Sequence, residues 1–266
     1  MNAILINSTA QYLEEIGKFE IRLKQESNYT DTKSILMAML EESEDRVLCR
    51  GEHRSFAEPC VSSLARKKSL GRANLRIELE CLAVKGWAEQ VALIDDKRLP
   101  ESPWEQVMLA RHHGLKTRLV DWTTNPLVAL FFACHIEADC SDDGNVFLVG
   151  APLVNLDRLN STPFLTTGQD YSYWSYDRSH EITENDLFIR PPSVLHARVT
   201  KQSGVFHVSN DIRLSAFELT QTKQCLSIPH DSKLIIVSEL NRLGINGISL
   251  ASETADSIAK KINMGF

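Results

Sequence analysis

Residues 104–134 read WEQVMLARHHGLKTRLVDWTTNPLVALFFAC, and the pattern changes twice within this segment. Gly114 ends a helical pattern, and residues 117–122, TRLVDW, follow as a short strand pattern. Asn125 suits the cap of a helix and Pro126 its first position, where a missing N–H costs nothing. The residues after Pro126, LVALFFA, carry no charge, which is typical of a helix buried on every face. The segment therefore predicts a strand, a tight polar turn and a central helix.

Polar side chains gather where this strand ends and the buried helix begins. They are Arg118, Asp121, Thr123 and Thr124, with Trp122 among them. A buried polar group without a partner is costly, so these groups must bond one another or a ligand. A purely structural alternative is an ion pair in which Asp121 holds Arg118 in place. The junction is the first place to expect a functional site.

Patterns typical of metal sites and disulfides are absent from the sequence. The six cysteines include no CxxC pair, and no Cys/His spacing fits zinc. We therefore expect free thiols in a reducing cytosol and no metal cofactor. His112 and His113 have no metal partner at a suitable spacing. They are candidate polar contacts to a ligand, with a structural role at the helix end as the alternative.

Length and composition fit a soluble globular protein. The 266 residues suit one large domain or a domain with an extension. Charged residues make up 24% and hydrophobic residues 43% of the chain. The formal net charge of −6 argues against a globally basic nucleic-acid binder but leaves a local basic patch open. Because no apolar run approaches membrane-spanning length and no signal peptide is recognisable, we expect a cytoplasmic protein without membrane contact.

Periodicity along the rest of the chain predicts an α+β fold with a mixed central sheet. Helical patterns cover residues 8–24, 31–40, 74–94, 104–110 and 253–262. The predicted strands are RVLCR (46–50), TRLVDW (117–122), NVFLVG (145–150), GVFHV (204–208), KLIIV (233–237) and INGISL (245–250). We expect a helical segment at residues 1–45 that packs against a domain of residues 46–266, with helices around the sheet.

Four parts of the chain resemble the FRG domain family. RHHGLKTRLVDWTTNPLVALFFA carries the family's His-Gly, Thr-Arg-Leu, Asp-Trp-Thr and apolar helix in order. Residues 50–66 keep an Arg-Gly pair and a Ser-Leu-x-Arg element, although Cys49 replaces the family's aromatic residue. Residues 198–206 and 244–259 resemble later family elements. There, Ala251-Ser252-Glu253 stands where the family usually has Phe-Pro-Asp.

The resemblance implies a bacterial or phage protein in a toxin or phage-defence setting. The order of residues is also similar to ADP-ribosyltransferases of the arginine–serine–glutamate type, an analogy at the level of the fold. That analogy implies NAD as substrate and a macromolecular target, either protein or nucleic acid. Its implied catalytic residues are Arg50, Asp121 and Glu253. Its implied NAD-binding residues are Arg50, Gly51, His113, Arg118, Thr123, Thr124 and Gln202.

Alternatives remain open for several of these residues and for the function. Arg50 suits a buried ion pair as well as an anionic ligand. Gln202 can instead be a buried side chain that bridges two loops. Glu253 can instead provide a favourable negative charge in the first turn of the last helix. The domain as a whole suits a non-catalytic module that binds a nucleotide or a protein. The oligomeric state is open.

Overall fold

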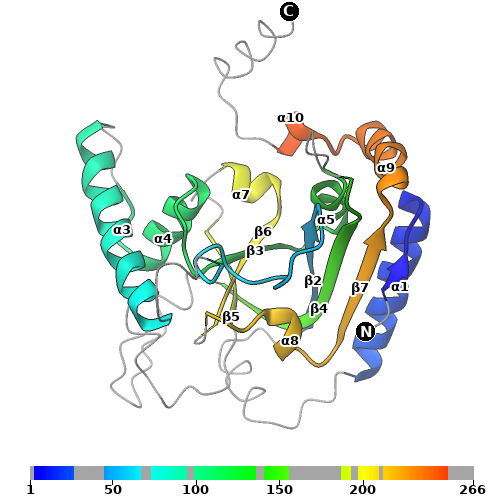
Figure 1. Ribbon diagram of the computed structural model, residues 1–266, viewed down its shortest axis with the longest axis horizontal. Coiled ribbons are helices and arrows are strands. Elements are labelled where there is room, and N and C mark those ends of the chain that lie inside the picture. Colours follow the sequence, from blue (N-terminus) through cyan, green and yellow to red (C-terminus); the bar gives the residue numbers. More distant parts are fainter. Residues whose placement is uncertain are drawn as a thin grey trace, which may run out of the picture.

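A computed structural model describes residues 3–26, 45–66, 73–94, 99–135, 141–155, 187–192, 197–209 and 212–250. These residues form a mixed seven-stranded sheet with helices packed on it, which confirms the expected α+β fold (Figure 1). The strands are β1 (Ile4–Leu5), β2 (Asp45–Glu52), β3 (Val120–Thr123), β4 (Gly144–Asn155), β5 (Leu187–Arg190), β6 (Gly204–Val208) and β7 (Lys223–Ile228). The helices are α1 (Thr9–Glu26), α3 (Ala73–Ile94), α4 (Pro103–His112), α5 (Pro126–Ala133), α7 (Ala197–Lys201), α8 (Ala216–Leu219), α9 (His230–Arg242) and α10 (Gly247–Leu250).

The strands follow the order β1-β7-β4-β2-β3-β6-β5 across the sheet. β1 runs parallel to β7 and β4 runs parallel to β5, whereas the other pairs are antiparallel. β4 is long enough to pair with β2 and β7 along its first part and with β5 at Leu153–Asn155. Because β5 also pairs with β6, the sheet curls back on itself.

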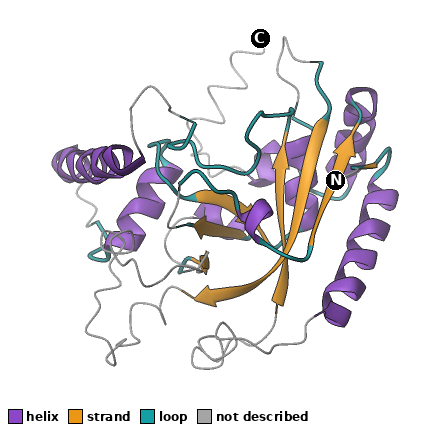
Figure 2. Cartoon of the chain, turned by 60° about the horizontal axis from the view of Figure 1, so that its bottom comes forward, coloured by secondary structure: helices purple, strands orange, loops and turns teal. Residues whose placement is uncertain are grey.

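The alternation of side chains along the strands divides the core into an inner and an outer part. Leu48, Trp122, Phe147, Phe188 and Val205 come from five different strands and share one buried inner cluster, with Ala216 of α8 beside them. The opposite faces of the strands lie under helices in two separate clusters. One lies beneath α1, α5 and α9, and the other lies beneath α3, α4 and α7. These two groups of helices flank opposite ends of the sheet (Figures 1 and 2).

The N-terminal helix packs directly against this core. α1 buries Tyr12, Ile16 and Phe19 in the cluster that it shares with α5 and α9. The hydroxyl of Tyr12 donates a hydrogen bond to the backbone oxygen of Pro126, 2.9 Å away, at the start of α5. Ahead of α1, β1 adds an edge strand beside β7. The expected packing of the N-terminal helix on the core is therefore observed, and the division at residue 45 stays a prediction.

Two predicted strands are helices. Residues 233–237, KLIIV, lie within α9, and residues 247–250 form α10. In α9 the buried Lys233, Ile236 and Leu240 recur at helical spacing, whereas Leu234 and Ile235 are exposed. The side-chain oxygen of Asn246 accepts hydrogen bonds from the backbone N–H groups of Ile248 and Ser249, as a helix cap does. The strand prediction gave too much weight to the β-branched residues of both segments.

The predicted helices at 8–24, 74–94, 104–110 and 126–133 correspond to α1, α3, α4 and α5. The predicted strands at 46–50, 117–122, 145–150 and 204–208 correspond to β2, β3, β4 and β6. β1, β5 and β7 were not predicted. The predicted helices at 31–40 and 253–262 lie outside the described residues.

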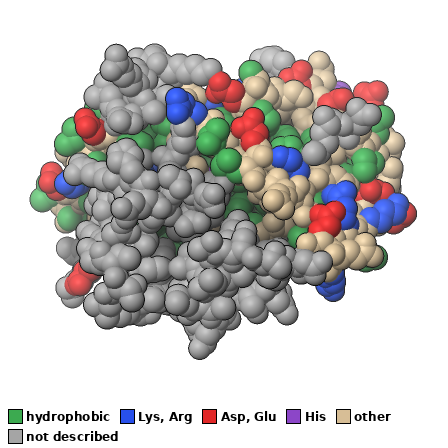
Figure 3. All heavy atoms as spheres, turned by 90° about the horizontal axis from the view of Figure 1, so that it is seen from below, with side chains coloured by type: hydrophobic (Ala, Val, Ile, Leu, Met, Phe, Trp, Pro, Cys, Tyr) green, Lys and Arg blue, Asp and Glu red, His purple; other side chains and the backbone are tan. Residues whose placement is uncertain are grey.

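Within the described ranges, no helix is long and apolar enough to cross a membrane. On the face seen in Figure 3, acidic and basic side chains of the described residues are intermingled instead of gathered by sign. On that face, the described part of the chain therefore presents no basic stripe of the kind that tracks a nucleic-acid backbone.

Candidate functional site

A cavity of about 430 Å³ lies where β2 and β3 separate. The two strands pair at a single position, Cys49 opposite Thr123, and then diverge. α5 forms one wall of the cavity, and the end of α4 with the α7–β6 turn forms the other. The lining residues are Cys49, Arg50, Gly51, Arg111, His112, Gly114, Asp121, Trp122, Thr123, Val128, Ala129, Phe132, Val199, Gln202, Gly204, Val205 and Phe206.

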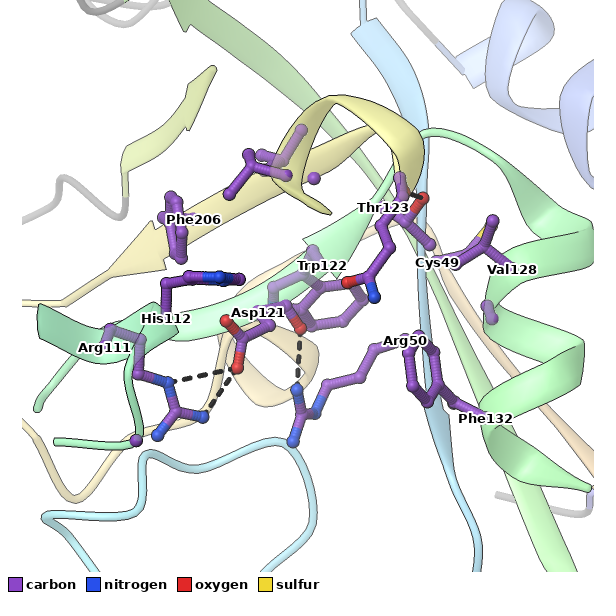
Figure 4. A pocket seen from close by; sticks show the side chains of 17 residues that line it. Cys49, Arg50, Arg111, His112, Asp121, Trp122, Thr123, Val128, Phe132 and Phe206 are labelled. Atoms are coloured by element: carbon purple, nitrogen blue, oxygen red, sulfur yellow. Dashed lines mark hydrogen bonds and ion pairs between the residues drawn. The ribbon is translucent and has the colours of Figure 1, made fainter. Parts of the chain in front are cut away.

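Arg50 crosses the gap between the two diverging strands (Figure 4). Its Nη1 donates to the backbone oxygen of Asp121 at 2.6 Å, and its Nε donates to Oε1 of Glu52 at 3.1 Å. No described residue bonds its remaining nitrogen, Nη2. Burial alone would lower the pKa of Arg50, but the charges of Glu52 and Asp121 outweigh it and raise the pKa above its ordinary value. The guanidinium is therefore fixed in place, permanently charged, and has a donor to spare.

Glu52 connects Arg50 to the following loop. Its side chain is 2% exposed, and its Oε1 also accepts from Nη2 of Arg66 at 3.1 Å and from the backbone N–H of Cys60 at 3.2 Å. Arg66 in turn lies over the ring of Phe56, 4.2 Å from its centroid. The two arginines retained from the sequence motif thus share one carboxylate. Arg50 therefore forms the ion pair that was given as its alternative role, and it also lines the cavity.

Asp121 is held by Arg111, and the structural alternative in which Asp121 pairs with Arg118 is wrong. Nη2 and Nε of Arg111 donate to Oδ2 of Asp121 at 2.6 and 3.2 Å, and Nη1 donates to Oγ of Ser63 at 2.8 Å. Arg118 instead forms an ion pair with Glu80 at 3.3 Å, in which the two side chains are 1% and 0% exposed. Arg118 precedes β3 and is buried, whereas Asp121 lies on β3 and is exposed.

Thr123 and Gln202 join β3 to the α7–β6 turn. The hydroxyl of Thr123 donates to the backbone oxygen of Gln202 at 2.6 Å and accepts from the backbone N–H of Asn125 at 3.0 Å. The side chain of Gln202 donates to the backbone oxygen of Leu250 at 3.0 Å, which is the bridging alternative for this residue. Thr124 uses its backbone N–H to bond Ser203 and does not line the cavity.

His113 lies away from the cavity, whereas His112 and Gly51 are on its wall. His113 is exposed and lies against Trp87, with 5.8 Å between ring centroids. At Gly51, a Cβ would overlap the backbone oxygen of Ala129 in α5. The atoms that approach this glycine closely are therefore those of a helix.

The charged residues that line the cavity are Arg50, Arg111 and Asp121, which leave one net positive charge. This contrasts with the formal charge of −6 for the whole chain. Burial raises the pKa of Cys49, and burial together with the charge of Glu52 raises the pKa of Cys60 well above its usual range. Neither thiol is a nucleophile at neutral pH. Among the described residues, no cluster of His, Cys, Asp or Glu could hold a metal ion.

Five of the residues implied by the resemblance meet at this cavity. They are Arg50, Gly51, Asp121, Thr123 and Gln202. His113, Arg118 and Thr124 lie elsewhere, and Glu253 lies outside the described residues. The described chain ends at Leu250, whose backbone oxygen is bonded to Gln202 on the cavity wall.

Four important residues were not predicted from the sequence: Glu52, Arg111, Phe132 and Phe206. Glu52 carried a usable signal, because it follows Arg50 by two residues on a strand and so shares its face. Arg111 lies in the last turn of α4, where a cationic side chain commonly interacts favourably with the helix dipole. Phe132 and Phe206 lie in apolar runs, and nothing in the sequence distinguishes a residue on a cavity wall from one in the core.

Comparison with known proteins identifies a family for part of the chain. The family model of the FRG domain matches residues 45–142, which span β2, α3, α4, β3 and α5. This range contains Arg50, Glu52, Arg66, Arg111 and Asp121. No curated protein and no solved structure matches the chain.

Proposed function

Because residues 45–142 carry an FRG domain, we propose that the cavity binds NAD and that the protein transfers ADP-ribose to a macromolecular target. The target is a protein or a nucleic acid, and the setting is a bacterial toxin or phage-defence system in the cytoplasm. The order of the key residues along the chain, with an early strand arginine, hydroxyls before an apolar helix and a late glutamate, supports this proposal by analogy.

The observation that carries the proposal is the state of Arg50. Two acceptors fix its guanidinium, while Nη2 has no partner in the described part of the chain. An arginine with a free edge on a cavity wall is suited to a phosphate oxygen, because its planar donors match phosphate geometry. The net positive charge of the lining residues favours the same class of ligand.

The remaining walls suit the other parts of a dinucleotide. Phe132, Phe206 and His112 supply flat ring surfaces on which a base or a nicotinamide can stack. The volume of about 430 Å³ falls within the range of small-molecule sites, about 300–1,000 Å³. The pyrophosphate would therefore be held by Arg50, with a ring against the aromatic side chains.

The reaction breaks the bond between C1′ of the nicotinamide ribose and the ring nitrogen. Nicotinamide leaves with the bonding electrons, which neutralise its positive charge. A nucleophile of the target forms a new bond to C1′ and releases its proton to a base. A carboxylate near the ribose stabilises the positive charge that develops there and can take up that proton. Glu253 is proposed for this role, and Asp121 is the alternative carboxylate.

A specific observation favours a non-catalytic nucleotide-binding module as the second candidate. Asp121 is the one carboxylate among the described lining residues, and Arg111 holds it through two nitrogens. The hydroxyl of Thr123 is also bonded within the protein. A cavity whose polar groups are already paired in this way binds a ligand without needing a group free for proton transfer.

Label transfer from NAD separates the two functions. Purified protein is incubated with a cell lysate and NAD labelled in the adenylate portion, and nicotinamide release is measured in parallel. We expect label on a macromolecular fraction, with loss of transfer in Glu253→Gln and retention of NAD binding. If Asp121→Asn and not Glu253→Gln abolishes transfer, Asp121 is the catalytic carboxylate. Binding of NAD without nicotinamide release in the wild type would establish the binding module and contradict the enzyme.

A further inference from the structure

We propose that Glu52 is a positioning residue, which holds the Arg50 guanidinium in the orientation that binds the anionic part of the ligand. Glu52 is not among the residues that line the cavity. It acts through Arg50, so its role in binding rests on the proposed function. The positioning of Arg50 itself is a property of the free protein and is tested separately.

The hydrogen bonds of Glu52 converge on a single oxygen. Oε1 accepts from Nε of Arg50, Nη2 of Arg66 and the backbone N–H of Cys60, at 3.1, 3.1 and 3.2 Å. These donors come from a strand and from the loop that follows it. The other oxygen, Oε2, is buried without a hydrogen-bond partner in the described part of the chain. The carboxylate is therefore tied to three points and cannot turn without breaking them.

This arrangement decides which edge of Arg50 is available. With Nε bonded to Glu52 and Nη1 bonded to the backbone of Asp121, the plane of the guanidinium is set by two fixed acceptors. An unrestrained arginine has many rotamers, and ordering it on binding costs side-chain entropy. Because Glu52 orders the side chain before a ligand arrives, binding does not carry that cost.

A second buried carboxylate in the described part of the chain, Glu80, also pairs with an arginine but lies away from the cavity. Glu80 accepts from the backbone N–H of Arg118 and pairs with its side chain, but neither residue lines the cavity. Both carboxylates are buried and both have an arginine partner. Glu80→Gln is therefore a matched control that separates positioning in the cavity from a general contribution to stability.

Nuclear magnetic resonance of the arginine side chains tests the positioning in the free protein. The Nε–H signal of Arg50 is assigned by its absence in Arg50→Lys. We expect slow solvent exchange of this proton in the wild type and an increase of about tenfold or more in Glu52→Gln, because a charge-assisted hydrogen bond becomes a neutral one. Glu80→Gln is expected to leave the rate unchanged. An unchanged rate in Glu52→Gln would overturn the proposal.

A double-mutant cycle then tests the effect on binding. Dissociation constants for NAD are measured for the wild type, Glu52→Gln, Arg50→Lys and the double variant. We expect Glu52→Gln to weaken binding about tenfold and to add little once Arg50 is replaced, since coupled residues are non-additive. Additive effects, or equal weakening by Glu80→Gln, would overturn the positioning role.

The two measurements distinguish the possible failures. If the wild type binds no NAD while Arg50 exchange responds to Glu52→Gln, the proposed function is wrong and the positioning of Arg50 stands. If Glu52→Gln does not fold, Glu52→Asp takes its place, because it keeps the charge and withdraws the carboxylate by one methylene. A folded Glu52→Asp with unchanged exchange and affinity would count against the proposal.

Discussion

Gly51 lies where α5 presses against β2, and the backbone of the helix leaves no room for a side chain. A Cβ at this position would overlap the backbone oxygen of Ala129 and approach the backbone nitrogen of Ala133 to 2.7 Å. Gly51 also lines the cavity beside Arg50. This one residue therefore sets how closely the buried helix approaches the strand that carries the arginine.

Gly51→Ala is expected to destabilise the protein by about 1–3 kcal/mol or more, because the helix backbone cannot move aside without disturbing the core. Urea unfolding of the purified variant measures the change. Gly17→Ala is the matched control, since a Cβ added at Gly17 in α1 would meet no atom of another element within 4 Å. At Gly17, replacement by alanine favours the helical conformation and is expected to stabilise the protein by up to about 1 kcal/mol. Equal effects of the two substitutions would contradict this account of Gly51.

At the scale of the elements, the β3–α5 junction and the α7–β6 turn form one unit. Thr123 bonds the backbone oxygen of Gln202, and the backbone N–H of Thr124 donates to the backbone oxygen of Ser203. Ser203 has a φ of +48°, a left-handed conformation that a serine rarely adopts. The two hydrogen bonds hold this turn against β3 and so fix the wall of the cavity formed by Gln202.

Thr123→Val is expected to cost about 1–3 kcal/mol, because it leaves the backbone groups of Gln202 and Asn125 without their partner. Chemical denaturation measures this cost. Thr124→Val is the control, since the hydrogen bond from Thr124 to Ser203 comes from its backbone. We expect that change to be smaller, and a larger loss in Thr124→Val than in Thr123→Val would argue against the hydroxyl as the link.

The contact between α1 and α9 gives a dependence on pH. Oε2 of Glu239 accepts from the backbone N–H of Thr9 at 2.8 Å, and hydrogen bonds from Thr9 lower the pKa of Glu239. A lowered pKa in the folded state means that the stabilisation is present above the unfolded pKa, near 4.5, and is lost as the pH falls through the folded value. Because Glu239 is only partly buried, solvent screening keeps this contribution below about 1 kcal/mol.

Glu239→Gln should therefore lower stability slightly at pH 7 and have little effect at pH 3. Unfolding free energies of the wild type and the variant at the two pH values provide the test. Glu218→Gln, at an exposed position on α8, is the control for the loss of one surface carboxylate. If the difference in unfolding free energy between Glu239→Gln and the wild type grew as the pH fell, it would contradict a lowered pKa of Glu239 in the folded state.

At the scale of the whole molecule, the sequence was most informative where a pattern was local. The Asn-Pro start of α5 and the apolar run after it predicted the central helix, and the cap bond from Leu127 to Asn125 is present. Arg50 and Thr123 were expected at one cleft, and both line the cavity. The helix prediction depended only on residues close together in the chain, whereas the shared cleft came from the family resemblance.

Long-range choices could not be read from the same patterns. Two arginines precede Asp121 within ten residues, and the tertiary structure selects the more distant one, Arg111 of α4, as its partner, while Arg118 pairs with Glu80. Residues 233–237 have strand propensity, yet they form part of α9. Their helical conformation goes with the packing of α9 beside α1, a long-range contact that local propensity does not include. Phe132 and Phe206 line the cavity, but in the sequence they look like ordinary core residues. Whether they face a cavity depends on how far β2 and β3 diverge.

Calorimetric titration of NAD into the wild type and Arg50→Lys tests the central claim most directly. Lysine keeps the positive charge beside Glu52 but loses the planar fork of donors. The account predicts that the wild type binds NAD at one site and that Arg50→Lys binds about tenfold to a hundredfold more weakly while folding normally. Absence of binding to the wild type, or equal affinity of the two proteins, would contradict it.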